Sequence, residues 1–233
     1  MKKNKHRGKK FWEREYKRGG HFALSERPSE DLVAFTRWLV REYGQRFLNT
    51  TSSVLDLGCG NGRNLVYLAR EFGMRGIGYD TSAEAIAAAQ KVTGGASLIY
   101  EVRSIAEPLP LPDASKTLVL DMMASHYLPR AAREALRAET ARVLKPGGWL
   151  FLKTFLREED IHAARLLREH PGKEAGSYVH PEIGLEEHVF TEEELLEELA
   201  PYFTVHKVKK SHHHMKDGRA RKRRSISAYA QKT

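Results

Sequence analysis

The chain has only one cysteine, Cys59, among its 233 residues. It can therefore form no disulfide within itself, as is typical of proteins in a reducing compartment. It also lacks an apolar run of roughly 20 residues, the length that a membrane-spanning helix needs. Its basic N-terminus has no apolar segment of the kind that defines a signal peptide. These absences predict a globular protein of the cytoplasm with no membrane partner.

Acidic residues are scarce at both ends of the chain. The formal net charge is +9, yet residues 1–20 carry +7 and residues 205–233 carry +9, which leaves an acidic body between them. Five of the six residues from Arg219 to Arg224 are basic. Such ends favour an anionic partner such as RNA, although a solvated surface that aids solubility has the same composition.

Hydrophobic periodicity divides the rest of the chain into short alternating elements. Strands are predicted over 53–57, 75–80, 97–102, 117–122 and 149–154, and helices over 63–72, 83–91 and 129–144. Two strands, 203–210 and 225–232, are expected to form a closing hairpin around the basic turn. Ser82 and Thr191 are predicted to cap the helices that follow them.

The domain organisation follows from these elements. We expect residues 1–20 to be a basic, partly disordered N-terminal extension, with disorder over 1–10 and a short helix from Phe11. Residues 21–233 are expected to form a single domain. Residues from about 155 to 190 fit no periodic pattern, so we interpret them as an insertion or lid.

The most informative stretch is 54–62, where an apolar run ends in Asp56 and passes into a glycine-dense turn before a periodic segment. This order predicts a strand, a tight loop and a helix whose first N–H groups face a ligand. The next predicted strand ends in Asp80, about where a β-α-β unit delivers a carboxylate to a ribose. Glycines alone would also fit a nicotinamide-dependent oxidoreductase.

Four ordered motifs extend this pattern: VLDLGCGNGRN, GYDTSAEAIAAA, AEPLPLPD and RVLKPGGWLFL. Together they resemble the class I S-adenosylmethionine-dependent methyltransferase family, over roughly residues 54–152. The resemblance implies a Rossmann-like α/β fold: a seven-stranded, mostly parallel sheet with helices on both faces and a C-terminal antiparallel hairpin. It also implies S-adenosyl-L-methionine as cofactor and S-adenosyl-L-homocysteine as product.

The resemblance further implies where the cofactor binds. The backbone of the glycine loop would follow its methionyl part, Asp56 would reach its amino group, and Asp80 would accept hydrogen bonds from its ribose hydroxyls. Ile105 stands where family members often carry an Asp that contacts adenine, so Ser104 or the local backbone must substitute. The expected cofactor-binding residues are Asp56, Leu57, Gly58, Cys59, Gly60, Gly62, Asn64, Asp80, Thr81, Ser104, Ile105, Ala106, Asp121 and Met122.

The acceptor is less constrained by the sequence. The segment after the fourth strand would face it, which makes Asp121, His126 and Tyr127 the catalytic candidates. Candidate substrate contacts are Tyr16, Tyr178, His180, His188, His212, His214, Arg221 and Arg224. The histidines lack a cysteine or close carboxylate that would complete a tetrahedral set, so we predict no metal site.

Three functions remain open on the sequence alone. The favoured one is methyl transfer to a small molecule. The second is methylation of RNA, or of an RNA-associated protein, that is bound by the basic ends of the chain. The third is a non-catalytic binding module with the same fold, which the departure at Ile105 motivates.

Overall fold

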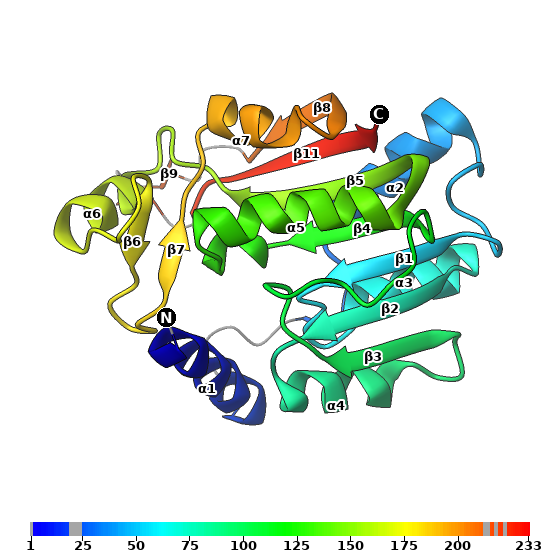
Figure 1. The fold of residues 1–233 in the computed structure, drawn as a ribbon, viewed down its shortest axis with the longest axis horizontal. Helices are drawn as coiled ribbons and strands as arrows, with labels where there is room; N and C mark the ends of the chain where they lie inside the picture. Colours follow the sequence, from blue (N-terminus) through cyan, green and yellow to red (C-terminus); the bar gives the residue numbers. More distant parts are fainter. Residues whose placement is uncertain (1, 19–24, 212–214, 217–218, 221–222) are drawn as a thin grey trace.

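The fold is described by a computed structural model, which covers residues 2–18, 25–211, 215–216, 219–220 and 223–233. Its centre is a seven-stranded sheet with the order β3-β2-β1-β4-β5-β11-β8 (Figure 1). The strands are β1 (Ser53–Leu57), β2 (Arg75–Asp80), β3 (Leu98–Val102), β4 (Lys116–Met122), β5 (Leu144–Phe155), β8 (Phe203–Lys210) and β11 (Ser225–Lys232). The first five are parallel, and β11 runs antiparallel to both β5 and β8. This confirms the expected fold class, including the C-terminal hairpin pair.

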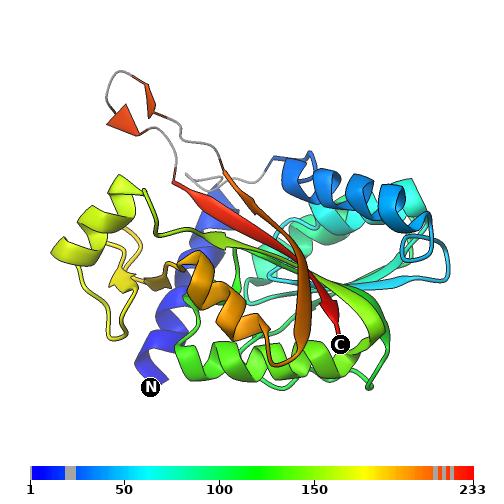
Figure 2. The same cartoon turned by 90° about the horizontal axis from the view of Figure 1, so that it is seen from above.

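Helices cover both faces of the sheet, which has a hydrophobic core on each side (Figure 2). They are α2 (Glu30–Tyr43), α3 (Arg63–Phe72), α4 (Ala83–Val92), α5 (Arg130–Val143) and α7 (Glu192–Leu199). Alternation along the strands supplies both cores: Val119 of β4 packs with α5 and α7, whereas Leu118 and Leu120 pack with α2 and α3. Burial on both faces explains why the centre of β4, residues 118–120, is entirely apolar.

The region from 155 to 190 forms a small subdomain at the carboxyl edge of the sheet. It contains α6 (Ile161–Glu169) and a two-stranded sheet of β6 (Ser177–Val179) and β7 (Glu186–His188). A single-turn 3-10 helix, η1 (Ser125–Tyr127), lies between β4 and the subdomain and contacts β7. The insertion therefore has its own short elements, and we propose that it acts as a lid.

The N-terminal extension differs from the expected disorder over residues 1–10. The structure has one helix, α1 (Lys2–Arg18), where the sequence predicted only a short helix from Phe11. α1 packs against α4 and buries Phe11. Its early turns are too polar to show an apolar stripe, and for that reason the periodicity missed them.

The basic turn of the closing hairpin holds two further short strands, β9 (Met215–Lys216) and β10 (Arg219–Ala220), which pair antiparallel. Within the described residues, none of the helices combines the length and the apolar character that crossing a membrane requires.

Candidate active site

The glycine loop joins β1 to α3 at the carboxyl edge of the sheet. Gly58, Gly60 and Gly62 all have positive φ, at 73°, 54° and 75°, a conformation that side chains rarely adopt. A Cβ on Gly58 would lie 2.6 Å from the Cβ of Ala124, and one on Gly62 would lie 2.6 Å from the hydroxyl of Tyr100. The loop is therefore a bare backbone cradle into which no side chain fits.

Asp80, at the end of β2, fixes this loop. Its Oδ2 accepts a hydrogen bond from the Gly60 N–H at 3.0 Å, and its Oδ1 accepts one from the Ser82 N–H at 2.9 Å. Burial raises the pKa of this carboxyl, and the same backbone donors oppose that rise. Each oxygen keeps a lone pair beyond these bonds, so the carboxylate can still accept from two hydroxyls.

Asp56, at the end of β1, has a buried carboxylate oxygen, Oδ2, without a hydrogen-bond partner. Burial raises its pKa to about 7, and the neighbouring carboxylates of Asp80 and Asp121 contribute to that rise. A buried carboxylate that lacks a donor is costly, which makes this atom a place for a cationic N–H donor. Arg63 is near enough to interact electrostatically with both Asp56 and Tyr16.

Helix α1 closes one side of this region. The Glu13 carboxylate accepts hydrogen bonds from the Ala83 N–H at 2.9 Å and the Glu84 N–H at 3.2 Å, so it caps α4 from outside. The ring of Trp12 meets the ring of Tyr127 edge-on, with centroids 5.6 Å apart. Sequence reasoning missed Glu13 because its partners are 70 residues away in the chain.

Tyr16, a candidate substrate contact, instead lies beside the cofactor loop. Its pKa is raised by burial and by the nearby Asp80 and Cys59. Cys59 itself is buried, with its Sγ against Gly78, and burial raises the pKa of its thiol. The thiol therefore packs as a small apolar group and is poorly suited to nucleophilic chemistry.

Several expected cofactor residues use their side chains elsewhere. The Asn64 amide accepts from the Ser29 N–H at 3.0 Å and donates to the Met122 Sδ at 3.4 Å, so it ties α2 to β4. Ile105 is buried in the core shared with Leu109, and the Ser104 hydroxyl accepts from the Ala106 N–H at 3.3 Å. The side chains of Asn64, Ser104 and Ile105 are thus engaged within the protein, and contacts of their backbone with a cofactor stay predictions.

Asp121 does not fit the role of a proton acceptor. Its Oδ2 is 2.7 Å from the Arg137 guanidinium, and its Oδ1 accepts from the Ser125 N–H at 3.1 Å. Both side chains of the pair are almost fully buried. The Asp121 carboxylate thus forms a structural ion pair below η1, which disfavours it as a proton acceptor, and its contact with the cofactor stays a prediction.

The two aromatic candidates after β4 differ. His126 is buried, both of its ring nitrogens lack a partner, and burial lowers its pKa to about 3. Its ring is buried and packs against Phe155 and Tyr127, which favours a packing role, and its catalytic role stays a prediction. Tyr127 is partly exposed and lines a cavity, and burial together with the Glu187 carboxylate raises its pKa well above the usual value.

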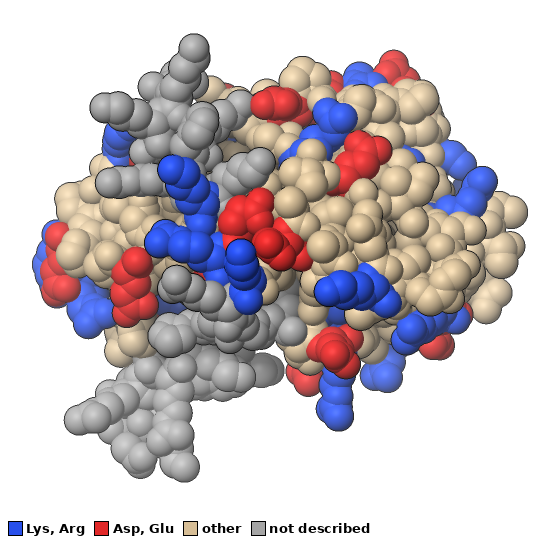
Figure 3. All heavy atoms as spheres, turned by 90° about the horizontal axis from the view of Figure 1, so that it is seen from below, with Lys and Arg blue, Asp and Glu red and all other residues tan. Residues whose placement is uncertain are grey.

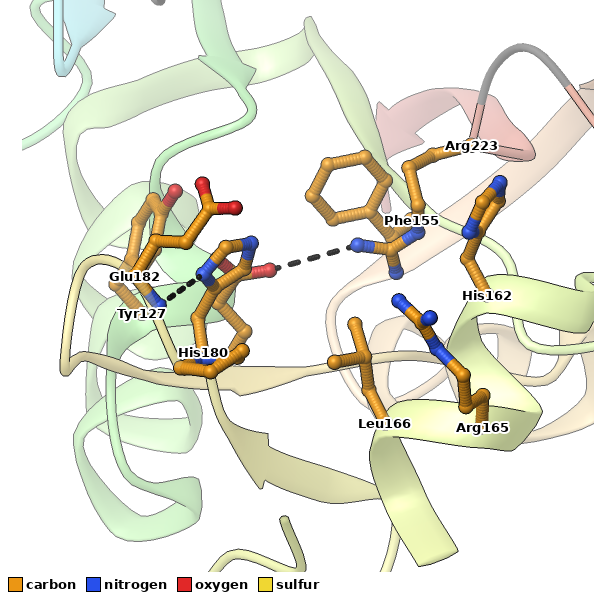
Figure 4. Close-up of a pocket in the computed structure, with 10 residues that line it drawn as sticks. Tyr127, Phe155, His162, Arg165, Leu166, His180, Glu182 and Arg223 are labelled. Atoms are coloured by element: carbon orange, nitrogen blue, oxygen red, sulfur yellow. Dashed lines mark hydrogen bonds and ion pairs between the residues drawn. The ribbon is translucent and has the colours of Figure 1, made fainter. Parts of the chain in front are cut away.

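The cavity lies between Tyr127 and the subdomain and has a volume of about 310 Å³ (Figure 4). Its wall includes Phe155 and Leu166 as apolar surface. Charged and imidazole groups from several elements line it: Arg223, Arg165, His162, His180, Glu182 and Glu187.

Of the predicted substrate contacts, some line this cavity and others are bonded to groups inside the protein. His180 lines the cavity, whereas the Tyr178 hydroxyl is buried and bonded to Glu187 and Arg223. The His188 Nε2 lies 2.7 Å from Glu194, inside the protein. Arg224 forms an ion pair with Glu159, and it donates to the Ser211 carbonyl at 3.0 Å. Tyr178, His188 and Arg224 therefore have structural partners within the protein, and a role for them in substrate binding stays a prediction.

Three further candidate contacts, His212, His214 and Arg221, lie outside the described residues. In the described part of the chain, no three His, Cys, Asp or Glu side chains gather in a group that could hold a metal ion.

Comparisons with known proteins agree with this geometry. A family model for a methyltransferase domain matches residues 54–148. The fatty-acid O-methyltransferase of Mycolicibacterium smegmatis is 38% identical over 105 residues, which are 45% of this chain and 37% of that protein. The chain spans less than half the length of the curated relatives that it matches first.

Solved structures share nearly the whole fold. A S-adenosylmethionine-dependent methyltransferase from Methanosarcina mazei superposes with a TM-score of 0.67 at 27% identity, covering 81% of this chain and 95% of that one. The 1,6-didemethyltoxoflavin N1-methyltransferase of Burkholderia thailandensis, solved with its substrate and S-adenosylhomocysteine, has a TM-score of 0.69 at 21% identity, covering 98% and 88%. The second likeness is one of fold alone.

Proposed function

We propose that this chain, which contains a class I S-adenosylmethionine-dependent methyltransferase domain, transfers the methyl group of S-adenosylmethionine to a small-molecule acceptor. The observation that carries the proposal is the unpartnered, buried oxygen of Asp56 at the end of a glycine cradle that Asp80 fixes. A cofactor with an ammonium group and a ribose diol satisfies both carboxylates.

In this proposal each part of the cofactor contacts a different set of residues. The backbone of Gly58, Cys59 and Gly60 follows the methionyl part, and Asp56 accepts hydrogen bonds from the ammonium group. Asp80 accepts from the ribose hydroxyls, and the backbone around Ile105 meets the adenine. Tyr16 on α1 covers the bound cofactor and excludes water from it, which favours the reaction.

When bound, the cofactor supplies an electrophilic methyl group together with its own leaving group. The protein then has to hold an acceptor atom in line with that methyl group. The segment from Ala124 to Tyr127 is placed for this task, because Ala124 touches Gly58 of the cradle and Tyr127 lines the cavity. The raised pKa of Tyr127 keeps its phenol protonated, so it can donate a hydrogen bond to the acceptor but is a poor base.

The cavity supports a small molecule over RNA as acceptor. A volume of about 310 Å³ lies at the lower end of the range for ligand pockets. Arg223 and Arg224, two of the five cations in the basic turn, form ion pairs with Asp160 and Glu159 inside the protein, so they do not extend outward as free cations towards an RNA backbone. Among the described side chains on the face seen in Figure 3, basic and acidic groups are interspersed. The similar fatty-acid and rifamycin methyltransferases also carry names of small-molecule acceptors.

Two measurements on the full chain test the proposal. Calorimetry with S-adenosylmethionine and S-adenosylhomocysteine should show binding in the micromolar range, and its absence at millimolar cofactor would contradict the proposal. Label transfer from tritiated cofactor into fractionated cell extract should appear among small molecules. Label confined to RNA or protein would refute the small-molecule acceptor, and cofactor binding without any transfer would favour the non-catalytic module.

A further inference from the structure

The cavity beside Tyr127 has a charge pattern that the methyl transfer itself does not require. We propose that it binds an anionic group of the acceptor, a carboxylate or a phosphate, through Arg223 and Arg165. This inference rests on the proposed function, since it takes the cavity to be the acceptor site. It adds the chemical class of the acceptor and the end by which the acceptor is held.

Arg223 is a fixed cation at the wall of the cavity. Its Nε lies 3.1 Å from Asp160 Oδ2, and its Nη1 donates to the Tyr178 hydroxyl at 2.6 Å. The guanidinium stacks on Phe155, with its central carbon 4.1 Å from the ring centroid. These contacts hold the plane of the guanidinium in one orientation before any ligand arrives.

One nitrogen of this guanidinium remains unsatisfied. The Nη2 of Arg223 is buried and has no hydrogen-bond partner. Figure 4 shows the guanidinium lying over the cavity, between Phe155 and the side chains of α6. A buried donor without a partner costs free energy, and an anionic oxygen in the cavity would remove that cost.

Arg165 brings a second cation from α6 into the same cavity, close to His162. Its ion pair with Glu169 is long, at 3.9 Å, and its side chain is 57% exposed, so Arg165 can leave that pair at little cost. Two guanidinium groups that face one space repel each other unless an anion lies between them. A carboxylate or phosphate fits both, because each can accept hydrogen bonds from two directions.

The acidic groups of the cavity do not occupy this position. The Glu187 carboxylate accepts from Tyr178 and is 3.7 Å from Arg223 Nη1, and no acidic side chain of the described residues is hydrogen-bonded to Nη2. Glu182 stands beside His180, at the Tyr127 side of the cavity in Figure 4. The acceptor would therefore lie with its anion at Arg223 and Arg165, its body against Phe155 and Leu166, and its reacting atom towards Tyr127.

Ligand-observed NMR on the full chain, saturated with S-adenosylhomocysteine, tests the anion site with three matched probes: benzoate, phenyl phosphate and benzamide. We expect at least one anion to bind about fivefold or more tightly than neutral benzamide, because a charge-assisted hydrogen bond replaces a neutral one. The stronger of the two anions identifies carboxylate or phosphate as the group recognised. Equal binding of all three probes, or no binding of either anion at millimolar concentration, overturns the inference.

The variant Arg165→Gln removes the mobile cation with little effect on folding, since its side chain is mostly exposed. We expect it to weaken anion binding about fivefold and to leave benzamide unchanged. The matched control is Arg168→Gln on the same helix, whose side chain is 72% exposed and does not line the cavity. Equal anion affinity in the two variants would also contradict the proposal. Binding of S-adenosylhomocysteine is measured in the same samples, so a failure of the proposed function is seen separately from a failure of the anion site.

Discussion

At the scale of single residues, Asp80 is the carboxylate on which the glycine loop and the start of α4 converge. Its oxygens already accept from the N–H groups of Gly60 and Ser82, so it is oriented before a ligand binds. We expect Asp80→Asn to weaken S-adenosylmethionine binding by about 1–3 kcal/mol, measured by calorimetry, because charge-assisted bonds to the ribose are lost. Asp113→Asn, at a side chain that is 79% exposed, should leave the affinity unchanged. Unaltered binding in Asp80→Asn would show that the ribose lies elsewhere.

Asp56 makes cofactor binding depend on pH. Its pKa of about 7 in the ligand-free protein means that much of it is protonated at neutral pH. A bound ammonium group favours the carboxylate, so binding should release a proton, and the affinity should rise several-fold from pH 6 to pH 7.5. Calorimetry in buffers with different ionisation enthalpies measures both effects. Asp56→Asn should bind more weakly with no such pH dependence, and a wild-type affinity that is flat over this range would contradict the prediction.

The Asp56 carboxyl has the opposite effect on folding stability: a rise in pH should increase cofactor affinity but decrease the free energy of unfolding. Because the pKa of Asp56 in the folded protein lies above the value of 3.8 for an Asp side chain in water, the folded protein holds a proton that the unfolded chain releases. The contribution of Asp56 to the free energy of unfolding therefore falls as the pH rises from about 4 to about 7, and is constant above that.

At the scale of elements, the sequence correctly predicted helix starts that depend on residues adjacent in the chain. Ser82 and Thr191 were predicted as N-caps, and their hydroxyls accept from the N–H groups of Ala85 and Glu194, at 3.2 and 3.0 Å. The strands β1 and β2 also have the predicted bounds. Helix α5 is different, because its buried face carries two arginines that periodicity would place in solvent. Their partners come from β4, the subdomain and α7, so no local pattern could reveal them.

Arg137 is the centre of this network on α5. It pairs with Asp121 at 2.7 Å and with Glu198 at 2.9 Å, and it donates to the Ser125 hydroxyl at 2.8 Å. Arg137→Met would leave a buried carboxylate without its cation, which typically costs about 3–5 kcal/mol of the free energy of unfolding.

Urea denaturation measures this loss. The control is Arg130→Met on the same helix, where an exposed pair with Glu134 should be worth no more than about 0.5 kcal/mol. A loss in Arg137→Met as small as in the control would mean that Asp121 is satisfied in another way, and would return it to the list of possible proton acceptors.

At the scale of the whole molecule, the sequence points to the proposed cofactor site much more directly than to the cavity proposed for the acceptor. The proposed cofactor site is built from motifs whose residues are close in the chain, such as Gly58 to Gly62 with Asp80. The cavity brings Tyr127, Arg165 and Arg223 together from three distant segments. Arg223 stood out in the sequence as part of a basic run that suggested RNA, yet its contacts lie inside the protein. Charge composition alone could not separate these two uses.

Asp160 joins the 155–190 subdomain to Arg223 and Arg224 at the end of the basic turn, which leads to a prediction about the whole molecule. Its carboxylate caps α6 by accepting hydrogen bonds from the His162 and Ala163 N–H groups, at 2.9 and 3.0 Å. It also accepts a hydrogen bond from the Arg224 N–H at 2.9 Å and forms an ion pair with the Arg223 guanidinium. Asp160→Ala should therefore release the subdomain from the sheet without touching the glycine loop. Hydrogen exchange in α6, β6 and β7 should become at least about tenfold faster.

Affinity for S-adenosylhomocysteine, by contrast, should stay within about twofold of the parent protein, and benzoate binding should be lost. Asp113→Ala, at an exposed ion pair, is the control for the loss of a carboxylate as such. If exchange in β1 and β4 rose as much as in α6, the subdomain would be part of the same cooperative unit as the sheet. The 155–190 segment would then be a fixed wall of the site, and closure over the acceptor would have to come from α1, which already contacts Tyr127 through Trp12.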